Sequence, residues 1–448
     1  MTTKVSIITL GCAKNEIDSE LILSILKENN YEITNHLVDA NIIIVNTCCF
    51  INDAKEESIN TILEMAQYKK SGKLKALIIA GCLAERYREE ILTEIPEVDA
   101  LLGTASFPKI LEVVEEITEG GQQVHFEALD RIPKLSTRRL LTSGTYTAYL
   151  KIAEGCDKHC TYCVIPSVRG NYRSVPMESL IEEANYLASQ GVKEIILVAQ
   201  ETTLYGTDLY GKKLLPKLLE ELSKIDGIAW IRILYCYPEE ITDELIEVIR
   251  KEEKVIPYLD IPIQHASDRI LKLMGRRTDQ ADLIRIINKL RKKIPGIVLR
   301  TTLITGFPTE TEEDHQELMD FVRDMKFERL GVFTYSKEED TPAAKLKPQI
   351  LAKVKKQRQK DLMKLQQANV FENSEKQIGK IFDVLVEGRV ADEEKVYIGR
   401  TYMDAPQVDG YIFFSSDEEL ISGDFVKVKV TSAKDYDLVG ELVEGCVM

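Results

Sequence analysis

Short apolar runs typical of strands alternate with helical patterns along most of this chain, and this alternation restricts the fold more than any other feature. In the first segment the apolar runs lie at 5–10, 42–45, 76–80 and 98–102, and helical patterns follow near 15–29, 53–68, 85–93 and 106–118. Such alternation is typical of a parallel sheet flanked by helices. The sequence therefore predicts an N-terminal α/β domain over residues 1–127.

The alternation stops at 128–147 and then resumes. This stretch loses its apolar periodicity and contains Pro133, Gly144 and several Ser and Thr residues, which predicts a linker. From Tyr149 onward six further strands are expected, at 149–153, 194–198, 230–234, 258–261, 298–303 and 330–333. Helical patterns fit between them, for example at 177–189, 239–251 and 312–325. Six strand-helix units favour an incomplete barrel over residues 148–375.

The last part of the chain changes character. Residues 347–377 form a long charged helical pattern that is expected to wrap the barrel, with its charges on a solvated face. After it come short strand patterns such as 382–386 and 425–430, separated by turns at Gly388, Gly399, Gly410 and Gly423. Strands at this spacing indicate a small β-barrel or sandwich over residues 376–448.

Three cysteines follow the first strand of the expected barrel with the spacing Cys-x-x-x-Cys-x-x-Cys: Cys156, Cys160 and Cys163. Thiolates are the ligands of iron–sulfur clusters. Three of them on a four-iron cluster leave one iron open to a small molecule with an amine and a carboxylate, such as S-adenosylmethionine. The alternative is zinc, but structural zinc normally has four ligands. No fourth Cys or spaced His pair follows closely after Cys163, and His159 lies inside the loop, so the spacing favours a cluster.

A second set of three cysteines occupies equivalent places in the first segment. Cys12, Cys48 and Cys82 each stand just past the carboxyl end of an expected strand, and in open parallel sheets that edge is where ligands bind. The sequence thus predicts a second cluster with one open iron. The alternative is that they are buried thiols in strand-to-helix turns. Cys49, Cys236 and Cys446 are interpreted as ordinary cysteines.

Composition limits the class of protein and its partners. A length of 448 residues predicts two or three domains, and 44% hydrophobic with 29% charged residues describes a soluble globular protein. No apolar run approaches the roughly 20 residues that span a bilayer, and a strand pattern begins at once, so a cytoplasmic protein without a signal peptide is expected. In the reducing cytoplasm, the nine cysteines are expected to be metal ligands or buried thiols rather than members of disulfides.

The formal charge of −15 bears on the choice of partner. A phosphate-rich partner prefers a basic surface, so free nucleic acid is not the first expectation, whereas a basic protein is compatible. Polar residues at carboxyl ends of barrel strands are candidates for holding a cofactor. These are Gln200, Glu201, Gln264, His265, Arg300, Thr302 and the turn at Gly306, although a structural role is the commoner one for any single residue of this kind. The run 169–174 could line the substrate approach or form a surface loop.

The cysteine loop, with an aromatic residue at Tyr162, resembles the signature of radical S-adenosylmethionine enzymes. Along nearly the whole chain the sequence resembles the methylthiotransferases of that superfamily, through the segments 10–15, 45–48, 80–82, 155–163 and 260–267. The segments 14–20, 198–203 and 235–238 are closer to the branch that modifies a ribosomal protein than to the branch that modifies tRNA. Ala13 and Thr309 depart from the family pattern, where Pro and Gly are usual. The C-terminal domain resembles a TRAM domain.

The resemblance implies a reaction and its cofactors. It implies two 4Fe–4S clusters, held by the two cysteine sets, and S-adenosylmethionine as both radical source and methyl donor, with cofactor contacts from Tyr162, Gln200, Glu201, Arg300, Thr302 and Gly306. The implied product is a methylthio group on the β carbon of an aspartate in the twelfth protein of the small ribosomal subunit, with a flavodoxin or ferredoxin as electron donor. The alternatives are methylthiolation of a tRNA adenosine, and an electron-transfer or RNA-binding protein with structural clusters.

Overall fold

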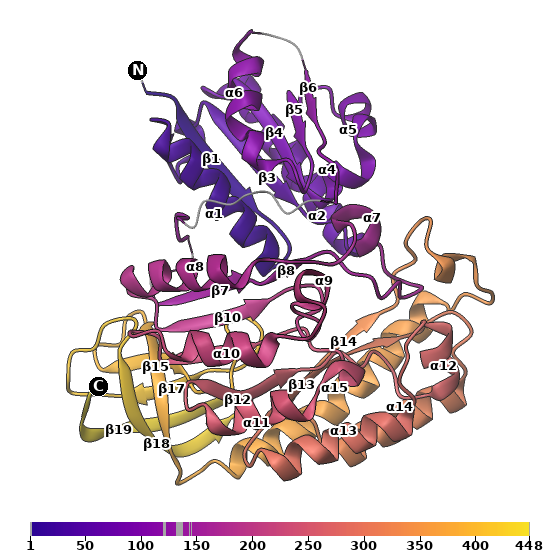
Figure 1. Cartoon of the computed structure of the whole chain (residues 1–448), viewed down its shortest axis with the longest axis vertical. Helices are drawn as coiled ribbons and strands as arrows, with labels where there is room; N and C mark the ends of the chain where they lie inside the picture. The colour runs from indigo at the N-terminus through magenta and orange to yellow at the C-terminus, as the bar shows by residue number, and fades with distance from the viewer. Residues whose placement is uncertain (1, 120–121, 131–137, 143, 145, 448) are drawn as a thin grey trace.

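The N-terminal domain is a parallel sheet covered by helices, as the alternating patterns predict (Figure 1). The computed structural model of the chain describes residues 2–119, 122–130, 138–142, 144 and 146–447. The strands lie in the order β2-β1-β3-β4-β5-β6 and all neighbours are parallel. They are β1 (Lys4–Thr9), β2 (Glu32–Ile33), β3 (Ile42–Thr47), β4 (Ala76–Gly81), β5 (Ala100–Leu102) and β6 (Gln123–His125). Strands β3 and β4 are buried along their whole length, as expected for central strands of a sheet covered on both faces.

Six α-helices and two 3-10 helices connect these strands. They are α1 (Ala13–Glu28), α2 (Asn52–Ala66), α3 (Tyr68–Ser71), α4 (Cys82–Tyr87), α5 (Glu89–Glu94), α6 (Ile110–Glu119), η1 (Leu37–Asp39) and η2 (Phe107–Lys109). Helices α1 and α4 begin within a few residues of the end of β1 and β4. These short connections keep the residues between strand and helix at the carboxyl edge of the sheet.

The central domain contains six parallel strands in sequential order, β7-β10-β11-β12-β13-β14, and the sheet is not closed. This is the predicted incomplete barrel. Its strands are β7 (Thr147–Lys151), β10 (Glu194–Val198), β11 (Trp230–Ile233), β12 (Val255–Asp260), β13 (Val298–Thr305) and β14 (Arg329–Thr334). The main helices are α8 (Met177–Ser189), α10 (Leu215–Ser223), α11 (Asp243–Lys251), α13 (Gln280–Lys293) and α14 (Glu312–Met325). Shorter elements are β8 (Ala153–Glu154), β9 (Arg173–Ser174), α7 (Ile165–Arg169), α9 (Thr207–Tyr210), α12 (Asp268–Leu273), η3 (Pro238–Glu240) and η4 (Pro342–Lys345).

Helix α15 (Ala352–Glu375) leads from the barrel to a closed five-stranded β-barrel and packs against β14 and α14 on the way. The small barrel has the order β15-β16-β17-β19-β18, with β15 (Ile381–Arg389), β16 (Val396–Arg400), β17 (Ile412–Ser415), β18 (Phe425–Lys434) and β19 (Asp437–Val447). Its core includes Trp230, Ile256 and Val298, which lie at or near the amino ends of central strands. The C-terminal domain therefore covers the amino end of the central barrel, and leaves its carboxyl end to the N-terminal domain.

Helix α1 joins the N-terminal domain to the central sheet. Ile17 and Leu21 of α1 share one core with Ile196 and Val198 of β10, so α1 covers part of the sheet that the central domain's own helices leave open (Figure 1). Within the described residues, no helix combines the length and the apolar character needed to cross a membrane. The domain limits 1–127, 128–147, 148–375 and 376–448 stay predictions, and Pro133 of the predicted linker lies outside the described residues.

Candidate functional site between the two domains

The Cys156 loop is held in place by backbone hydrogen bonds from three distant segments. Cys156 N donates to Gly170 O (3.1 Å), Thr161 N to Met274 O (3.0 Å) and Ala343 N to Thr161 O (2.9 Å). Gly155 precedes the loop with φ +81°, and a Cβ there would lie 2.1 Å from Asn171 O, so only glycine fits. The loop that carries Cys156, Cys160 and Cys163 is therefore preformed by the fold.

Each sulfur of this loop has a polar donor beside it. Lys158 N donates to Cys156 Sγ and Ile165 N to Cys163 Sγ, both at 3.5 Å. Beside Cys160 Sγ lie the Tyr237 hydroxyl at 3.5 Å and Arg276 Nη1 at 4.0 Å. Burial raises the pKa of the Cys156 thiol to about 11 and that of Cys163 to about 12. A metal that binds here must therefore displace protons from the thiols, while the nearby donors favour the thiolates that result.

The second set of cysteines lies at the carboxyl edge of three neighbouring strands. Cys12 follows β1, Cys48 follows β3 and Cys82 is the first residue of α4 after β4. The turn at Gly11, with φ +96°, passes so close to Cys48 that an added Cβ would lie 2.8 Å from Cys48 Cβ and 3.1 Å from its Sγ. Burial raises the pKa of Cys48 to about 12, and the charges of Cys82 and Cys12 act on it in the same direction. The fold thus brings together residues that are far apart in sequence.

The donor set at each location is three sulfur atoms. Within the part of the chain that the structure describes, no three His, Cys, Asp or Glu side chains converge closely enough to share one metal ion. An iron–sulfur cube does not require the three sulfurs to converge on one atom, because each thiolate binds a different iron. The chemistry of both cysteine sets fits this use, and the role of the six cysteines as ligands stays a prediction.

A buried network of charges connects the two sets of cysteines. Arg169, the last residue of α7, donates from Nε to Cys82 Sγ (3.4 Å), from Nη1 to Asp18 Oδ2 (2.8 Å) and from Nη2 to Asn15 Oδ1 (2.6 Å). Lys151 Nζ lies 2.6 Å from Asp18 Oδ1 and 2.9 Å from Glu154 Oε2. Since Asp18 belongs to α1 and Glu154 directly precedes Gly155, the network fixes the N-terminal domain against the cysteine loop.

The end of β10 presents polar atoms that have no hydrogen-bond partner. Gln200 Nε2 donates to Glu154 Oε1 (2.6 Å), but Gln200 Oε1 is buried without a partner. Glu201 is fully buried, and its Oε1 accepts from Thr203 N (2.9 Å) and from the Thr203 hydroxyl, while Oε2 has no partner. Burial raises the pKa of Glu201 to about 7. Unpaired buried polar atoms are rare, and two at the predicted cofactor position fit a polar ligand there.

The segment after β12 shows the same feature. Gln264 has a left-handed backbone, with φ +73°, and its Oε1 is buried without a partner. His265 is fully buried, and its Nε2 makes no hydrogen bond but lies 3.7 Å from Glu310 Oε2. Thr302 accepts a backbone bond from Gln264 (2.9 Å). The ring of Tyr162 packs edge-on against Phe307, with centroids 6.5 Å apart. Tyr162 belongs to the cysteine loop itself, and the role of these residues in holding a cofactor stays a prediction.

Two predicted cofactor residues have other roles in the structure. Arg300 is the third of eight residues in β13 and not at its carboxyl end, so its expected position is wrong. Its Nη1 pairs with Asp260 Oδ1 (2.9 Å), and its Nε lies 3.7 Å from Asp409 Oδ1 of the C-terminal domain. Gly306 does follow β13, with φ +70°, and an added Cβ would lie 2.3 Å from Lys355 Cγ of α15. Close packing of α15 is sufficient reason for this glycine.

Sequence reasoning missed two groups beside the Cys156 loop. Arg276 stacks on the Tyr237 ring, 4.2 Å from its centroid, and Lys158 Nζ lies 4.8 Å from the same centroid. The two missed groups are Tyr237, which lies in a segment that contributes only to the resemblance, and Arg276, which nothing in the sequence marks. Only the fold brings these two side chains close to Cys160.

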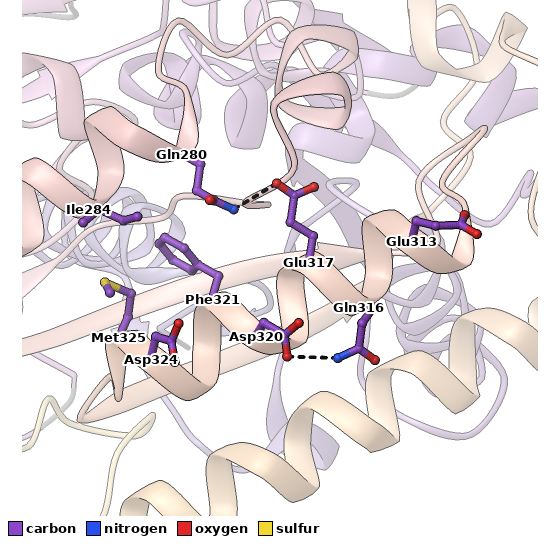
Figure 2. A pocket seen from close by; sticks show the side chains of 9 residues that line it. All are labelled: Gln280, Ile284, Glu313, Gln316, Glu317, Asp320, Phe321, Asp324 and Met325. Atoms are coloured by element: carbon purple, nitrogen blue, oxygen red, sulfur yellow. Dashed lines mark hydrogen bonds between the residues drawn. The ribbon is translucent and has the colours of Figure 1, made fainter.

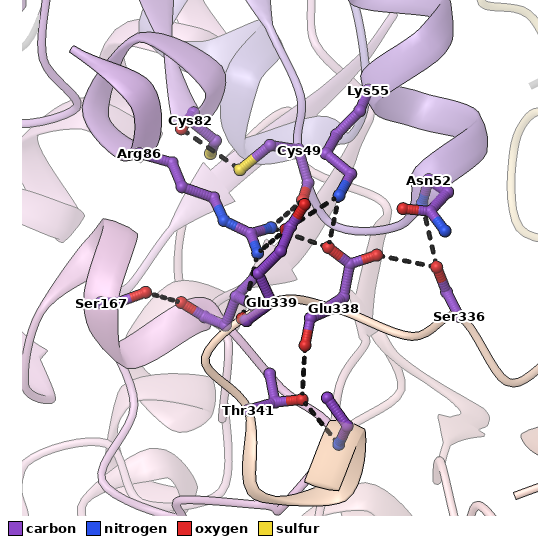
Figure 3. Close-up of polar contacts among 12 residues, drawn as sticks. Cys49, Asn52, Lys55, Cys82, Arg86, Ser167, Ser336, Glu338, Glu339 and Thr341 are labelled. Atoms are coloured by element: carbon purple, nitrogen blue, oxygen red, sulfur yellow. Dashed lines mark hydrogen bonds and ion pairs between the residues drawn. The ribbon is translucent and has the colours of Figure 1, made fainter. Parts of the chain in front are cut away.

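A second set of ion pairs fastens the two domains near Cys82 (Figure 3). Arg86 Nη1 lies 2.7 Å and Lys55 Nζ 3.0 Å from Oε2 of the buried Glu338, and Arg86 Nη2 lies 2.7 Å from Glu339 Oε2. Cys49 Sγ donates to Cys82 O (3.2 Å) in the same view. Cys49 thus has a structural contact of its own, in agreement with its interpretation as an ordinary cysteine.

A groove of about 450 Å³ lies between α13 and α14 on the outside of the barrel (Figure 2). Gln280 Nε2 donates to Glu317 Oε1 (3.0 Å) and Gln316 Nε2 to Asp320 Oδ1 (3.0 Å) at its wall. None of the residues that line it belongs to either set of cysteines.

Comparisons with known proteins agree with this architecture. A model of the uncharacterized protein family UPF0004 matches residues 4–103, one of the radical SAM superfamily matches 150–322 and one of the TRAM domain matches 378–443. The cobalamin- and [4Fe-4S]-bound radical S-adenosylmethionine methyltransferase TsrM from Kitasatospora setae has a similar fold, with a TM-score of 0.56 over 77% of each chain at 14% identity.

Curated relatives match over the full length. "Ribosomal protein uS12 methylthiotransferase RimO" of Lachnoclostridium phytofermentans is 62% identical over 437 residues, which cover 98% of this chain and 99% of the relative. The protein of the same name from Acetivibrio thermocellus is 53% identical over 450 residues, which cover 99% of each chain. The chain therefore belongs to the RimO family of ribosomal protein uS12 methylthiotransferases.

Proposed function

We propose that this protein inserts a methylthio group at the β carbon of an aspartate in ribosomal protein uS12. The observation that carries this proposal is the full-length similarity, at 62% identity, to a protein named for uS12 methylthiotransfer. Two sets of three cysteines that face one domain interface support it, because the reaction needs both a radical source and a sulfur source. The named substrate of the relatives favours uS12 over tRNA adenosine.

The cysteines are proposed to hold two 4Fe–4S clusters, Cys156, Cys160 and Cys163 at the barrel and Cys12, Cys48 and Cys82 at the rim of the N-terminal sheet. When bound, the clusters and S-adenosylmethionine supply the electron, the radical, the sulfur and the methyl group. The chain's own residues orient and shield these groups. Backbone amides of Lys158 and Ile165 donate to sulfurs of the loop, and Arg169 donates to Cys82.

Other residues are proposed to contact S-adenosylmethionine. The unpaired Gln200 Oε1 and Glu201 Oε2 are acceptors for an ammonium or hydroxyl donor, and Tyr162 lies beside the loop. Thr302 lies inside β13 and Gly306 directly follows it, and both are proposed from the resemblance. Arg300 is held by two carboxylates, and its cofactor contact has no support beyond the resemblance. A flavodoxin or ferredoxin as electron donor and a cytoplasmic location also stay predictions.

The test is a mass measurement on candidate substrates. The reconstituted protein is incubated with S-adenosylmethionine, dithionite and either uS12 or tRNA, and fragment masses locate the added group. A methylthio group on one aspartate of uS12 is the expected result. Modification of tRNA adenosine instead would assign the tRNA activity, and the absence of 5′-deoxyadenosine would leave only a binding or electron-transfer protein.

A further inference from the structure

Lys14 is a buried cation at the interface between the N-terminal domain and the central barrel. It is the second residue of α1, two positions after Cys12, and only 7% of its surface is exposed. Its Nζ lies 3.5 Å from Ala199 O, just past the end of β10, and 3.6 Å from the centroid of the Tyr235 ring, just past the end of β11. The ammonium therefore stands where the N-terminal domain meets the carboxyl edge of the barrel.

This ammonium has no carboxylate partner among the described residues. The nearby carboxylates Asp18 and Glu154 are both taken, because Lys151 and Arg169 each pair with both of them. Both carboxylates are thus occupied by Lys151 and Arg169, and Lys14 stands outside this network of ion pairs. A buried charge without a counter-ion is expensive, and one long contact to a carbonyl and one ring face compensate for it only in part. An anion that arrives with a ligand would complete the balance.

The residues that hold Lys14 are themselves fixed by the fold. Tyr235, which holds Lys14 from the other side, has a left-handed backbone with φ +62° and is fixed by its N–H bond to Asp260 Oδ2 (3.1 Å). Non-glycine residues in this conformation are costly and gather at functional sites.

We propose that the Lys14 ammonium binds the side-chain carboxylate of the substrate aspartate, with Tyr235 as the residue that positions Lys14. The inference rests on the proposed function and adds a specificity contact to it. In an aspartate the β carbon is bonded directly to the carboxyl carbon, so a charge-assisted bond to the carboxylate places the reacting carbon between the two cofactor sites. It also selects aspartate over asparagine, which carries no charge.

The test compares binding of two substrates without turnover. Affinities of the reconstituted enzyme, without reductant, are measured for uS12 and for uS12 with its target aspartate changed to asparagine. The natural enzyme is expected to bind the aspartate form about tenfold more tightly, which corresponds to about 1.4 kcal/mol. Lys14→Met should bind both forms equally, and Lys14→Arg should keep part of the preference because it keeps the charge.

Lys55→Met is the matched control. Lys55 is as buried as Lys14, at 8% exposed, and lies at the same domain interface, but it is paired with Glu338. This variant should retain the tenfold preference, even if it weakens binding of both substrates. If Lys14→Met is poorly folded, Lys14→Gln keeps a polar side chain without the charge and must also lose the preference.

The outcomes separate the inference from the proposed function. A tenfold preference that persists in Lys14→Met and Lys14→Gln, or an equal affinity of the natural enzyme for both substrates, overturns the role of Lys14. Methylthiolation of uS12 by the natural enzyme in the same preparation would leave the proposed function intact in either case. Failure to modify uS12 at all would instead remove the proposed function.

Discussion

Four non-glycine residues with left-handed backbones lie in the cysteine loop or in segments that follow barrel strands. His159, Tyr235, Gln264 and Thr309 have φ between +50° and +73°. For Thr309, a β-branched residue where the family usually has glycine, the conformation is costly. It is held by a bond from its N–H to Pro348 O (2.9 Å) and one from Arg269 Nη1 to its hydroxyl (3.1 Å). The departure from glycine is thus accommodated by local contacts.

The first prediction concerns the three cysteines of the loop. Changing Cys156, Cys160 or Cys163 to Ala should abolish 5′-deoxyadenosine formation, because each change removes one of three proposed thiolates. The product is measured by chromatography after incubation with S-adenosylmethionine and dithionite. Cys236→Ala is the control: this thiol is fully buried in the barrel core, and its loss should cost stability but not the product. Deoxyadenosine from the triple variant would refute the assignment.

The second prediction follows from the raised pKa of Glu201. Burial penalises its charged form, and the pKa rises from 4.5 to about 7. Between these values the folded state binds more protons than the unfolded one, so this group lowers the stability of the fold as pH rises through that window. Glu201→Gln should remove the effect. The free energy of unfolding of this variant minus that of the natural protein should therefore increase by about 3 kcal/mol between pH 4.5 and pH 8.

Denaturant titrations of the cluster-free protein at several pH values measure this difference. Parallel pH profiles of Glu201→Gln and the natural protein would show that the carboxyl group keeps its ordinary pKa. A difference that grows toward low pH would show that the shift has the opposite sign.

At the scale of single elements, the sequence pattern predicts the first and last residues of some helices and strands correctly. Strand β10 and helices α8 and α14 span the predicted ranges 194–198, 177–189 and 312–325. In α14 the reason is local, because Thr311 and Asp314 form a capping box at its start. Strands β2 and β6 were missed, since they have two and three residues and exist only through pairing with a neighbour. Helix α15 begins at Ala352, after Pro348, and not at the predicted 347.

In the candidate site, too, some features follow from the local sequence and others depend on residues far apart in the chain. The places of both sets of cysteines after strands could be predicted, because their spacing is visible in the sequence, while their role as cluster ligands stays a prediction. Lys14 and Arg276 could not, because their contacts join residues 185 and 116 positions apart. Arg300 and Thr302 lie farther from the carboxyl end of their strand than expected, because β13 extends to Thr305, two residues beyond its predicted end.

The third prediction concerns the edge of the N-terminal sheet. Changing Cys12, Cys48 and Cys82 together to Ala should roughly halve the bound iron, since two clusters of equal size are proposed, and should leave radical generation intact. Methylthio transfer should be lost. Iron is measured by elemental analysis and deoxyadenosine by chromatography. Cys49→Ala, one residue from Cys48, is the matched control and should keep the full iron content. Unchanged iron in the triple variant would show that these three are buried thiols.

At the scale of the whole molecule, buried ion pairs fasten the C-terminal domain to the barrel. Glu194, the first residue of β10, lies 2.8 Å from Arg232 Nε and 2.6 Å from Arg400 Nη2 of β16, and all three side chains are fully buried. The two guanidinium groups hold the pKa of Glu194 below its ordinary value, against the effect of burial. Asp404 pairs with Arg329 in the same interface. The two domains therefore form one unit, and part of the acidic charge of the C-terminal domain is neutralised inside it.

Six acidic residues of that domain face solvent together, in two short runs. From 376 to 448 the sequence has 15 Asp and Glu against 8 Lys and Arg, a charge of 8 − 15 = −7. Two exposed acidic runs, 392–394 and 417–419, flank β16 and β17. They lie side by side, because Lys395 pairs with Asp417 (2.5 Å) and Ser416 N donates to Lys395 O (3.0 Å). This acidic surface suits a basic protein and repels phosphate.

The last prediction tests this surface as a docking site for uS12. Changing Asp392, Glu393 and Glu394 to Lys should weaken association with the ribosomal protein, because attraction between opposite charges becomes repulsion. The effect should be mainly on the association rate, and largest at low salt, where screening is least. Stopped-flow or surface binding at two salt concentrations measures it. A matched variant is Asp320, Asp324 and Glu313 to Lys, which reverses three charges in the groove between α13 and α14 and leaves the C-terminal domain unchanged. Equal loss in both variants would show that only net charge matters, and no loss in the first would show that its acids are merely a solvated surface.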